Sequence, residues 1–478
     1  MIIPNPNDKS AGSQLNNILF QLCKDIEESP GINPPAACRY YFLIGSLMWN
    51  TLACLDNSFP FVDGFRANRL NIAYRRTERE PWCYFLNCLT FCFLELKRTE
   101  CPWITVPKHE DRVIICQEYC RSVKQYLKKR HQDGFITDKE FDYPNKGYFI
   151  QIDHDIQDLS SLPDPDSWTP LATLQPDGNY KKQSFVAPFF GEVENWFSTN
   201  EWDQVWKIAD DNYPSKKVFE QQIDNLVEIS ANLTNEQKIK AEVWAGTEPK
   251  KATPPTKWII MLGLVIAAKS YPLKESVALI GGVCFNLFHA GVAAWAVKTK
   301  YLQKRPIQGI RQKYHDQIIK SPYTQEMTVG ALWMPWQEYS LVTPGFSDYV
   351  SGHSTFSMAC SSFFQMIYKS DAIPLSGVFV IPEYYQLLTN LFNDIKEPCC
   401  VYQIFLSPLC SQVNKNYPTA PVLLSWKSWN DLANEIGMSR IYGGIHWENS
   451  NMAGLKIGSF VSKTLFDKIN WQVMNLRL

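Results

Sequence analysis

Apolar positions recur at helical spacing along much of the chain. Near the N-terminus, Leu15, Ile18, Leu19, Leu22 and Ile26 fall on one face of a helix with 3.6 residues per turn. A second helix is expected over residues 36–55, directly after a pair of prolines, because proline suits a first helical turn. A third is expected over residues 112–130.

The helical pattern breaks in two places. Pro, Asp, Gly and Ser cluster within residues 134–200, which predicts a long ordered loop. Helical spacing resumes at Phe219, and Thr234 with Gln237 makes a capping box that opens a helix over residues 238–244. Residues 371–421 are a second irregular stretch, typical of an insertion. Alternating β-type runs are few, so the fold is expected to be mainly α, with room for a small hairpin in the loops.

Two apolar runs could be mistaken for membrane segments. Residues 277–297 are long enough to cross a bilayer, whereas residues 258–268 are too short. The longer run carries Asn286 and His289 near its middle, which favours a buried helix in a large bundle. We therefore expect no membrane insertion.

Composition excludes some partners. The 478 residues are 45% apolar and 20% charged, as in an ordinary globular protein. The formal net charge of -1 provides no global field for nucleic acid, so attraction for an anion must be local. The N-terminus lacks a signal-peptide pattern and the 14 cysteines are scattered, which predicts free thiols and a cytoplasmic location. Cys88/Cys92 and Cys116/Cys120 lack further ligands at zinc-site spacing, so packing is favoured over metal binding there.

Three short boxes carry the candidate chemistry. In the first, residues 298–306 (KTKYLQKRP), Lys298 and Arg305 are seven positions apart, so they can project from one helix face that Pro306 would end. Two such cations can neutralise an oxyanion, the Arg as a two-pronged donor. A solvated basic helix end explains the same residues.

The second and third boxes supply hydroxyl, amide and imidazole groups. Ser351, Gly352 and His353 precede a predicted helix, whose N-terminus attracts anions; a simple capping turn with a surface His is the alternative. In SRIYGGIH, Arg440 and His446 flank a glycine turn, and the His could be a nucleophile or a metal ligand. The alternative is that the Arg lies on the surface and the His is packed in the core, with no role in binding. The three boxes together favour one oxyanion site.

At these residues the chain resembles the superfamily of vanadium-dependent haloperoxidases and their related acid phosphatases. The shared signature is Lys, six residues, Arg-Pro; then Ser-Gly-His; then Ser-Arg, three residues, Gly, one residue, His. The segments SWTPLATLQPDG, SFVAPFFGEV, FHAGVAAWAVK and FSDYVSGHSTFS extend the resemblance toward the haloperoxidase branch, from about residue 166 to the C-terminus. It implies two packed four-helix bundles with long ordered loops. We expect an N-terminal region over residues 1–204 and a site-bearing domain over residues 205–478.

The resemblance also implies a cofactor and roles for the residues. Vanadate would be bound through vanadium to His446, while His353 would contact its apical oxygen and move protons. Its equatorial oxygens would be held by Lys298, Arg305, Ser351, Gly352 and Arg440. Trp295 and Phe346 match positions that line the halide side of the pocket in chloroperoxidase-type members.

Three activities remain open on this basis. In the first, hydrogen peroxide oxidises a halide, which then modifies a small organic substrate. In the second, phosphate monoesters are hydrolysed through a phosphohistidine at His446. The third is a degenerate member that binds an oxyanion without turnover. Halide preference, the organic substrate and assembly into a homo-oligomer are left open.

The chain departs from the family pattern at three supporting positions. Ser450 stands where an acidic residue often follows the last His by four positions. Gly246 lies in a turn that commonly carries Asp, and His289 replaces an Asp before the AGVAAW stretch. Losing these carboxylates would loosen the Arg and His side chains that they orient, unless Glu448 or Glu248 compensates.

Overall fold

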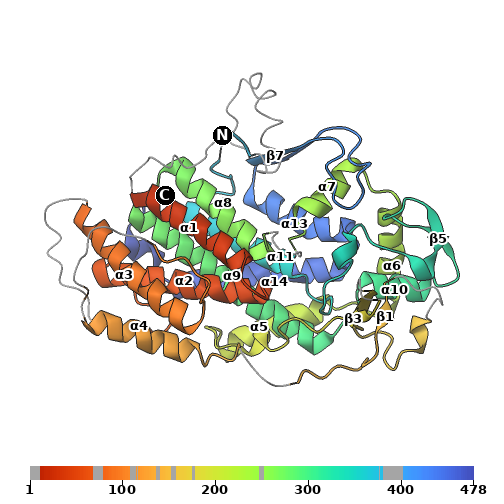
Figure 1. Ribbon diagram of the computed structural model, residues 1–478, viewed down its shortest axis with the longest axis horizontal. Coiled ribbons are helices and arrows are strands. Elements are labelled where there is room, and N and C mark those ends of the chain that lie inside the picture. Colours follow the sequence, from red (N-terminus) through yellow and green to blue (C-terminus); the bar gives the residue numbers. More distant parts are fainter. Residues whose placement is uncertain are drawn as a thin grey trace.

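The computed structural model describes residues 11–67, 79–107, 115, 117–135, 140–151, 158–174, 178–246, 252–375, 377–379 and 402–478. Helices dominate this part of the chain, which confirms the mainly α prediction (Figure 1). The helices are α1 (Ala11–Glu27), α2 (Pro34–Leu55), α3 (Arg79–Thr99), α4 (Gln117–Arg130), α5 (Thr199–Asn212), α6 (Lys216–Ala231), α7 (Asn235–Val243), α8 (Pro254–Lys269), α9 (Leu273–Tyr301), α10 (Pro306–Lys313), α11 (Gly352–Tyr368), α13 (Trp429–Tyr442) and α14 (Glu448–Lys468).

Helix α9 is the centre of the molecule. It packs against α1, α2 and α8 on one side and against α11 and α14 on the other, while α13 packs on α11 (Figure 1). Two four-helix groups therefore share α9. Its sequence is apolar on all faces, as expected for a helix surrounded by others. In the part of the chain described, α9 is the helix long and apolar enough to cross a membrane, and its most apolar window is wholly buried inside the protein.

Small sheets occupy the two stretches predicted to be irregular. Strand β1 (Phe149–Ile150) runs parallel to β2 (Leu171–Leu174), which pairs antiparallel with β3 (Tyr180–Lys182). Strand β6 (Gly377–Phe379) runs parallel to β7 (Tyr402–Leu406), which pairs antiparallel with β8 (Val422–Trp426). A further hairpin joins β4 (Ile318–Lys320) and β5 (Met327–Val329). The chain therefore holds more β structure than the single hairpin expected.

Several helix boundaries differ from the sequence predictions. The apolar face of α1 and the capping box of α7 are confirmed, the latter with Thr234 as N-cap. The third predicted helix begins at Gln117, and residues 112–114 lie outside the described part. The expectation that helical structure resumes at Phe219 is wrong, because α5 begins at Thr199 behind a capping box of Ser198 and Glu201. The expected division between residues 204 and 205 falls inside α5.

Close packing of α11 on α14 places the second box beside the third. A Cβ atom on Gly454 would lie 2.7 Å from the carbonyl oxygen of Ser351. The amide of Ser351 also donates to the carbonyl of Ser450 at 3.0 Å. Glycine in α14 therefore lets the N-terminus of α11 approach the backbone that follows His446.

Candidate oxyanion-binding active site

The first box spans the junction of two helices. Lys298 lies in the last turn of α9, which ends at Leu302 in a left-handed conformation, φ 49°. Arg305 is the N-cap of α10, and Pro306 is the first residue of that helix. The expectation that both cations project from one helix that Pro306 ends is therefore wrong. Proline starts the next helix instead, because the first helical position needs no amide donor and accepts its fixed φ.

Both cations of this box are buried and held by backbone carbonyls. Lys298 Nζ donates to the carbonyls of Ser347 at 3.0 Å and Asp348 at 2.8 Å. Arg305 Nη1 donates to the carbonyl of Ile445 at 2.8 Å, within the third box. Burial and the neighbouring Arg305 hold the pKa of Lys298 well below its usual value. Such cations are poised to gain stability from an anion.

The second box caps α11. Ser351 is the N-cap residue, and its hydroxyl oxygen accepts from the amide of Ser354 at 3.3 Å. His353 Nε2 lies 2.9 Å from the carbonyl of Trp244 and 3.0 Å from that of Ala245. Burial and the charge of Arg440 hold the pKa of His353 well below 6.5. The ring is therefore neutral, with Nε2 protonated and Nδ1 able to accept a proton.

The third box begins in the last turn of α13. Arg440 Nε donates to the hydroxyl of Ser439 at 3.0 Å, and Nη2 donates to the carbonyl of Ala241 in α7. Burial lowers the pKa of Arg440 to about 9. The turn then reverses at Gly444, whose φ of 65° favours glycine, and leads to His446 just before α14.

The two nitrogens of His446 meet different neighbours. Nδ1 lies 2.7 Å from Oδ1 of Asp348 and 3.2 Å from the hydroxyl of Ser450. Nε2 lies 3.4 Å from Nη1 of Arg305. Burial, with the charges of Arg305 and Lys298, holds the pKa of His446 well below 6.5. The neutral ring with its proton on Nδ1 presents the Nε2 lone pair, as a nucleophile or metal ligand requires.

Asp348 is the functional residue that the sequence motifs did not reveal. It lies three positions before Ser351, is fully buried, and faces both His446 and Arg305. Burial raises its pKa to about 6, although Arg305 and Lys298 pull it down. The compensating carboxylate for Ser450 is therefore neither Glu448, which is exposed, nor Glu248, which lies outside the described residues. A signal was available, since an acidic residue inside an otherwise uncharged buried box needs a charged partner.

The other two departures have structural explanations. His289 Nε2 accepts from the amide of Trp196 at 3.1 Å, and Nδ1 donates to the carbonyl of Phe285 at 2.8 Å. Burial lowers its pKa to about 3, so the ring is a neutral link between α9 and the loop before α5. At Gly246, φ is 57°, and a Cβ atom would meet the carbonyl of Ala252. Backbone carbonyls of this turn, in place of a carboxylate, hold His353.

The donors left over at the centre fit an oxyanion. Arg305 Nη2 and Arg440 Nη1 are buried and have no hydrogen-bond partner among the residues that the structure describes. The N-terminus of α11 adds amides that the helix itself cannot satisfy. Lys298 and Arg305 interact with the buried carboxylate of Asp348, whereas Arg440 has no carboxylate partner among the described residues, which leaves positive charge for an anion. No group of three or more His, Cys, Asp or Glu in the described ranges could hold a bare metal cation. A tetrahedral or trigonal metal oxyanion such as vanadate suits this donor set.

Aromatic rings cover one side of these donors. Trp295 and Phe346 have ring centroids 5.2 Å apart. Lys298 Nζ lies 5.0 Å from the Phe346 ring centre and 5.8 Å from that of Trp295. A Cβ atom on Gly352 would touch the Trp295 ring at 3.4 Å. The structure thus brings all nine sequence-predicted residues into one region.

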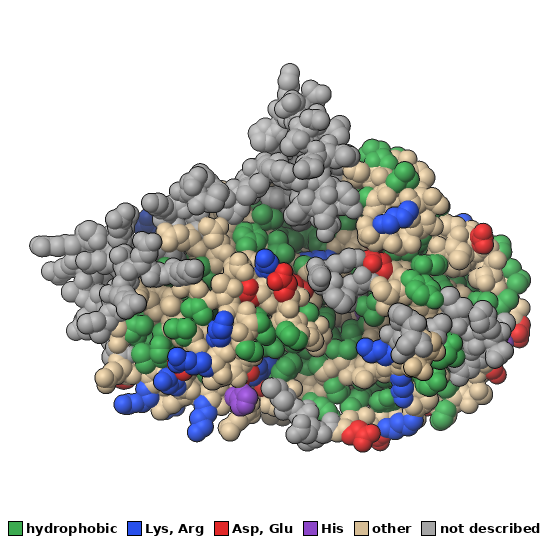
Figure 2. All heavy atoms as spheres, in the orientation of Figure 1, with side chains coloured by type: hydrophobic (Ala, Val, Ile, Leu, Met, Phe, Trp, Pro, Cys, Tyr) green, Lys and Arg blue, Asp and Glu red, His purple; other side chains and the backbone are tan. Residues whose placement is uncertain are grey.

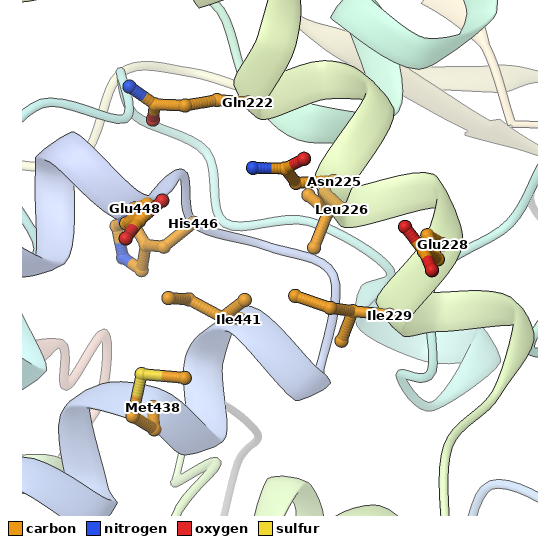
Figure 3. A pocket seen from close by; sticks show the side chains of 9 residues that line it. All are labelled: Gln222, Asn225, Leu226, Glu228, Ile229, Met438, Ile441, His446 and Glu448. Atoms are coloured by element: carbon orange, nitrogen blue, oxygen red, sulfur yellow. The ribbon is translucent and has the colours of Figure 1, made fainter.

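A pocket of about 330 Å³ reaches this region from the surface. Residues of α6, among them Asn225 and Leu226, face Ile441 and Met438 of α13 across it (Figure 3). Figure 3 shows Glu448 beside His446, with Glu228 on the opposite side. Lys298, Arg305 and Arg440 are buried. The Lys and Arg side chains that Figure 2 shows on the surface gather instead at the lower left, over the α3 and α4 end.

Comparisons with known proteins agree with this geometry. Residues 279–475 match the family model described as the VCPO second helical-bundle domain. A holo-type bacterial vanadium-dependent chloroperoxidase superposes with a TM-score of 0.66 at 13% identity, covering 96% of this chain and 98% of that one. Its apo-type counterpart gives 0.61 at 13% identity, covering 91% and 95%.

A bacterial vanadium-dependent iodoperoxidase gives a TM-score of 0.60 at 13% identity, covering 96% of each chain. By sequence, no curated protein matches the chain. The fold of these structures and the family model for the C-terminal bundle both agree with the resemblance seen in the three boxes. Residues 279–475 are thus similar to the second helical-bundle domain of the VCPO family, and the whole chain shares the fold of the vanadium-dependent haloperoxidases.

Proposed function

We propose that this protein is a vanadium-dependent haloperoxidase, which oxidises a halide with hydrogen peroxide at vanadate bound to His446. The observation that carries the proposal is the Nε2 lone pair of His446 in a buried site where Arg305 and Arg440 each keep an unpaired N–H. Bound vanadate would supply Lewis acidity without changing oxidation state. In the net reaction, halide, hydrogen peroxide and one proton give hypohalous acid and water.

The residues of the chain divide the remaining work. His446 would hold the cofactor, and Arg305, Arg440, Ser351 and the amide of Gly352 would donate hydrogen bonds to its oxygens. Two of the three N–H groups of Lys298 donate to backbone carbonyls, so the third is left to polarise an oxygen of the bound oxyanion. His353 accepts a proton from incoming hydrogen peroxide at Nδ1, because Nε2 is already protonated and engaged.

Phosphate hydrolysis is the alternative chemistry for the same donors. His446 would attack phosphorus, and His353 would protonate the leaving group. Two features favour the peroxidase. The rings of Trp295 and Phe346 lie beside Lys298 and would give a bound halide an apolar environment. The pocket also carries Glu228 and Glu448, which repel doubly charged phosphate esters.

Two assays on one preparation test the proposal. The protein is loaded with orthovanadate, and bromide-dependent halogenation of a phenolic dye by hydrogen peroxide is measured. Hydrolysis of p-nitrophenyl phosphate is measured on vanadate-free protein. Halogenation that depends on both vanadate and bromide supports the proposal. Hydrolysis alone would contradict it in favour of a phosphatase, and vanadate binding without either activity would indicate a degenerate member.

A further inference from the structure

Asp348 connects the three boxes from a fully buried position. Its backbone carbonyl accepts from Lys298 Nζ at 2.8 Å and from the Ser450 hydroxyl at 3.0 Å. Its side-chain Oδ1 lies 2.7 Å from His446 Nδ1 and 3.7 Å from Arg305 Nη1. Among the described residues, this carboxylate is the only one that forms an ion pair with either of these two side chains. It is therefore placed to control the orientation of His446.

The side chain at position 450 is complementary to this arrangement. Ser450 lies one helical turn after His446, and its hydroxyl is 3.2 Å from the same Nδ1. A serine at this position is short and uncharged, so a carboxylate can approach Nδ1 from the loop before α11. An acid at both positions would bury two negative charges around one imidazole, which is costly. We therefore expect one carboxylate beside this imidazole, at position 348 or at position 450, but not at both.

We propose that Asp348 is the positioning residue for His446, in place of the acid that related chains carry four residues after that histidine. With Oδ1 2.7 Å from Nδ1, the charge of the carboxylate favours a proton on that nitrogen and so directs the Nε2 lone pair into the site. Without it, the acceptor left for Nδ1–H among the described residues is the Ser450 hydroxyl, which donates its own proton to the Asp348 carbonyl. The ring would then be held by one neutral contact. This inference rests on the proposed oxyanion site.

The consequence is measured as oxyanion affinity rather than turnover. Isothermal titration calorimetry of the vanadate-free protein with orthovanadate gives the dissociation constant, and inorganic phosphate serves as a second probe. Removing a carboxylate that orients a metal-binding histidine typically weakens metal affinity by about 10- to 100-fold. We expect Asp348→Ser to weaken vanadate binding by that factor.

An exchange of residues separates positioning from simple structural support. The double variant Asp348→Ser/Ser450→Asp returns one carboxylate to Nδ1 from the opposite side, and we expect it to recover most of the lost affinity. Ser450→Asp alone adds a second buried carboxylate, so it should bind vanadate more weakly than wild type. A merely structural role for Asp348 would not be repaired by an acid at position 450.

Two further variants control the experiment. Asp166→Ser removes a carboxylate that pairs with Lys304 at 2.8 Å but does not touch His446, so its vanadate affinity should equal that of wild type. Asp348→Asn keeps an oxygen that can accept from Nδ1–H, so it should lose less affinity than Asp348→Ser. It also provides a test if the serine variant does not fold.

The outcomes distinguish this inference from the proposed function. If wild type binds vanadate and both Asp348 variants bind it equally well, Asp348 does not position His446 and the inference fails. Failure of Ser450→Asp to improve a folded Asp348→Ser variant would also overturn it. If wild type binds neither vanadate nor phosphate, the proposed function itself fails.

Discussion

Replacing Arg440 by methionine should separate oxyanion binding from folding stability. The guanidinium is fully buried and contacts no carboxylate in the described part of the chain, so burial alone lowers its pKa to about 9. Nη1 has no partner, whereas Nε and Nη2 are satisfied. Burying an uncompensated ion costs several kcal/mol, and a methionine of similar length removes that cost. We expect the vanadate-free variant to be as stable as wild type or more so.

Vanadate should stabilise the Arg440→Met variant much less than it stabilises wild type. A hydrogen bond between charged groups contributes about 1.5–3 kcal/mol, so the dissociation constant should rise by about 10- to 150-fold. At a vanadate concentration of about 100 times the wild-type dissociation constant, ligand stabilises wild type by about 2.7 kcal/mol. The same concentration should stabilise Arg440→Met by only about 0.3–1.4 kcal/mol. Differential scanning fluorimetry with and without orthovanadate measures this as a smaller rise in Tm.

Arg311→Met is the matched control. Arg311 is also buried, but its donors are satisfied by the carbonyls of Trp333, Ile150 and Gln151. Its loss should lower the Tm of the vanadate-free protein and leave the vanadate-induced rise intact. The reasoning is refuted if Arg440→Met keeps the full rise, or if Arg311→Met, while folded, loses it.

Two other predictions concern charge. Folded His289 is neutral down to pH of about 3, whereas in the unfolded chain it binds a proton below pH 6.5, so stability falls as pH drops through this window. Between pH 7 and 5, the free energy of unfolding measured by urea titration should fall by about 2 kcal/mol less in His289→Gln than in wild type. The same pH dependence in both proteins would contradict a neutral buried His289. Glu448→Gln should lower the inhibition constant of phenyl phosphate for halogenation by about 2- to 5-fold at low salt, because an exposed charge contributes about 1 kcal/mol or less. Equal constants for variant and wild type would show that Glu448 does not repel phosphate esters.

The sequence predicted which residues meet at the site, but it did not predict the local backbone geometry around them. The three boxes meet around Lys298, Arg305 and His446, as their order and spacing indicated. The spacing of seven between Lys298 and Arg305, however, fits a continuous helix and a helix–turn–helix junction equally well. The proline that was expected to end one helix begins another, because both positions suit its missing amide.

Contacts between distant segments were beyond the sequence pattern. Asp348 meets His446 only through packing of α11 on α14, and no spacing rule links a loop residue to a side chain about a hundred positions away. The role of His289 depends likewise on Trp196 of another segment. The start of α5 was different, since Ser198 and Glu201 form a capping box that the local sequence already displays.

A crystal structure of the protein soaked with orthovanadate would locate the oxyanion. We expect one vanadium atom within bonding distance of His446 Nε2, with its oxygens accepting hydrogen bonds from Arg305 Nη2 and Arg440 Nη1. Vanadium bound elsewhere, or an empty site at saturating vanadate, would contradict it.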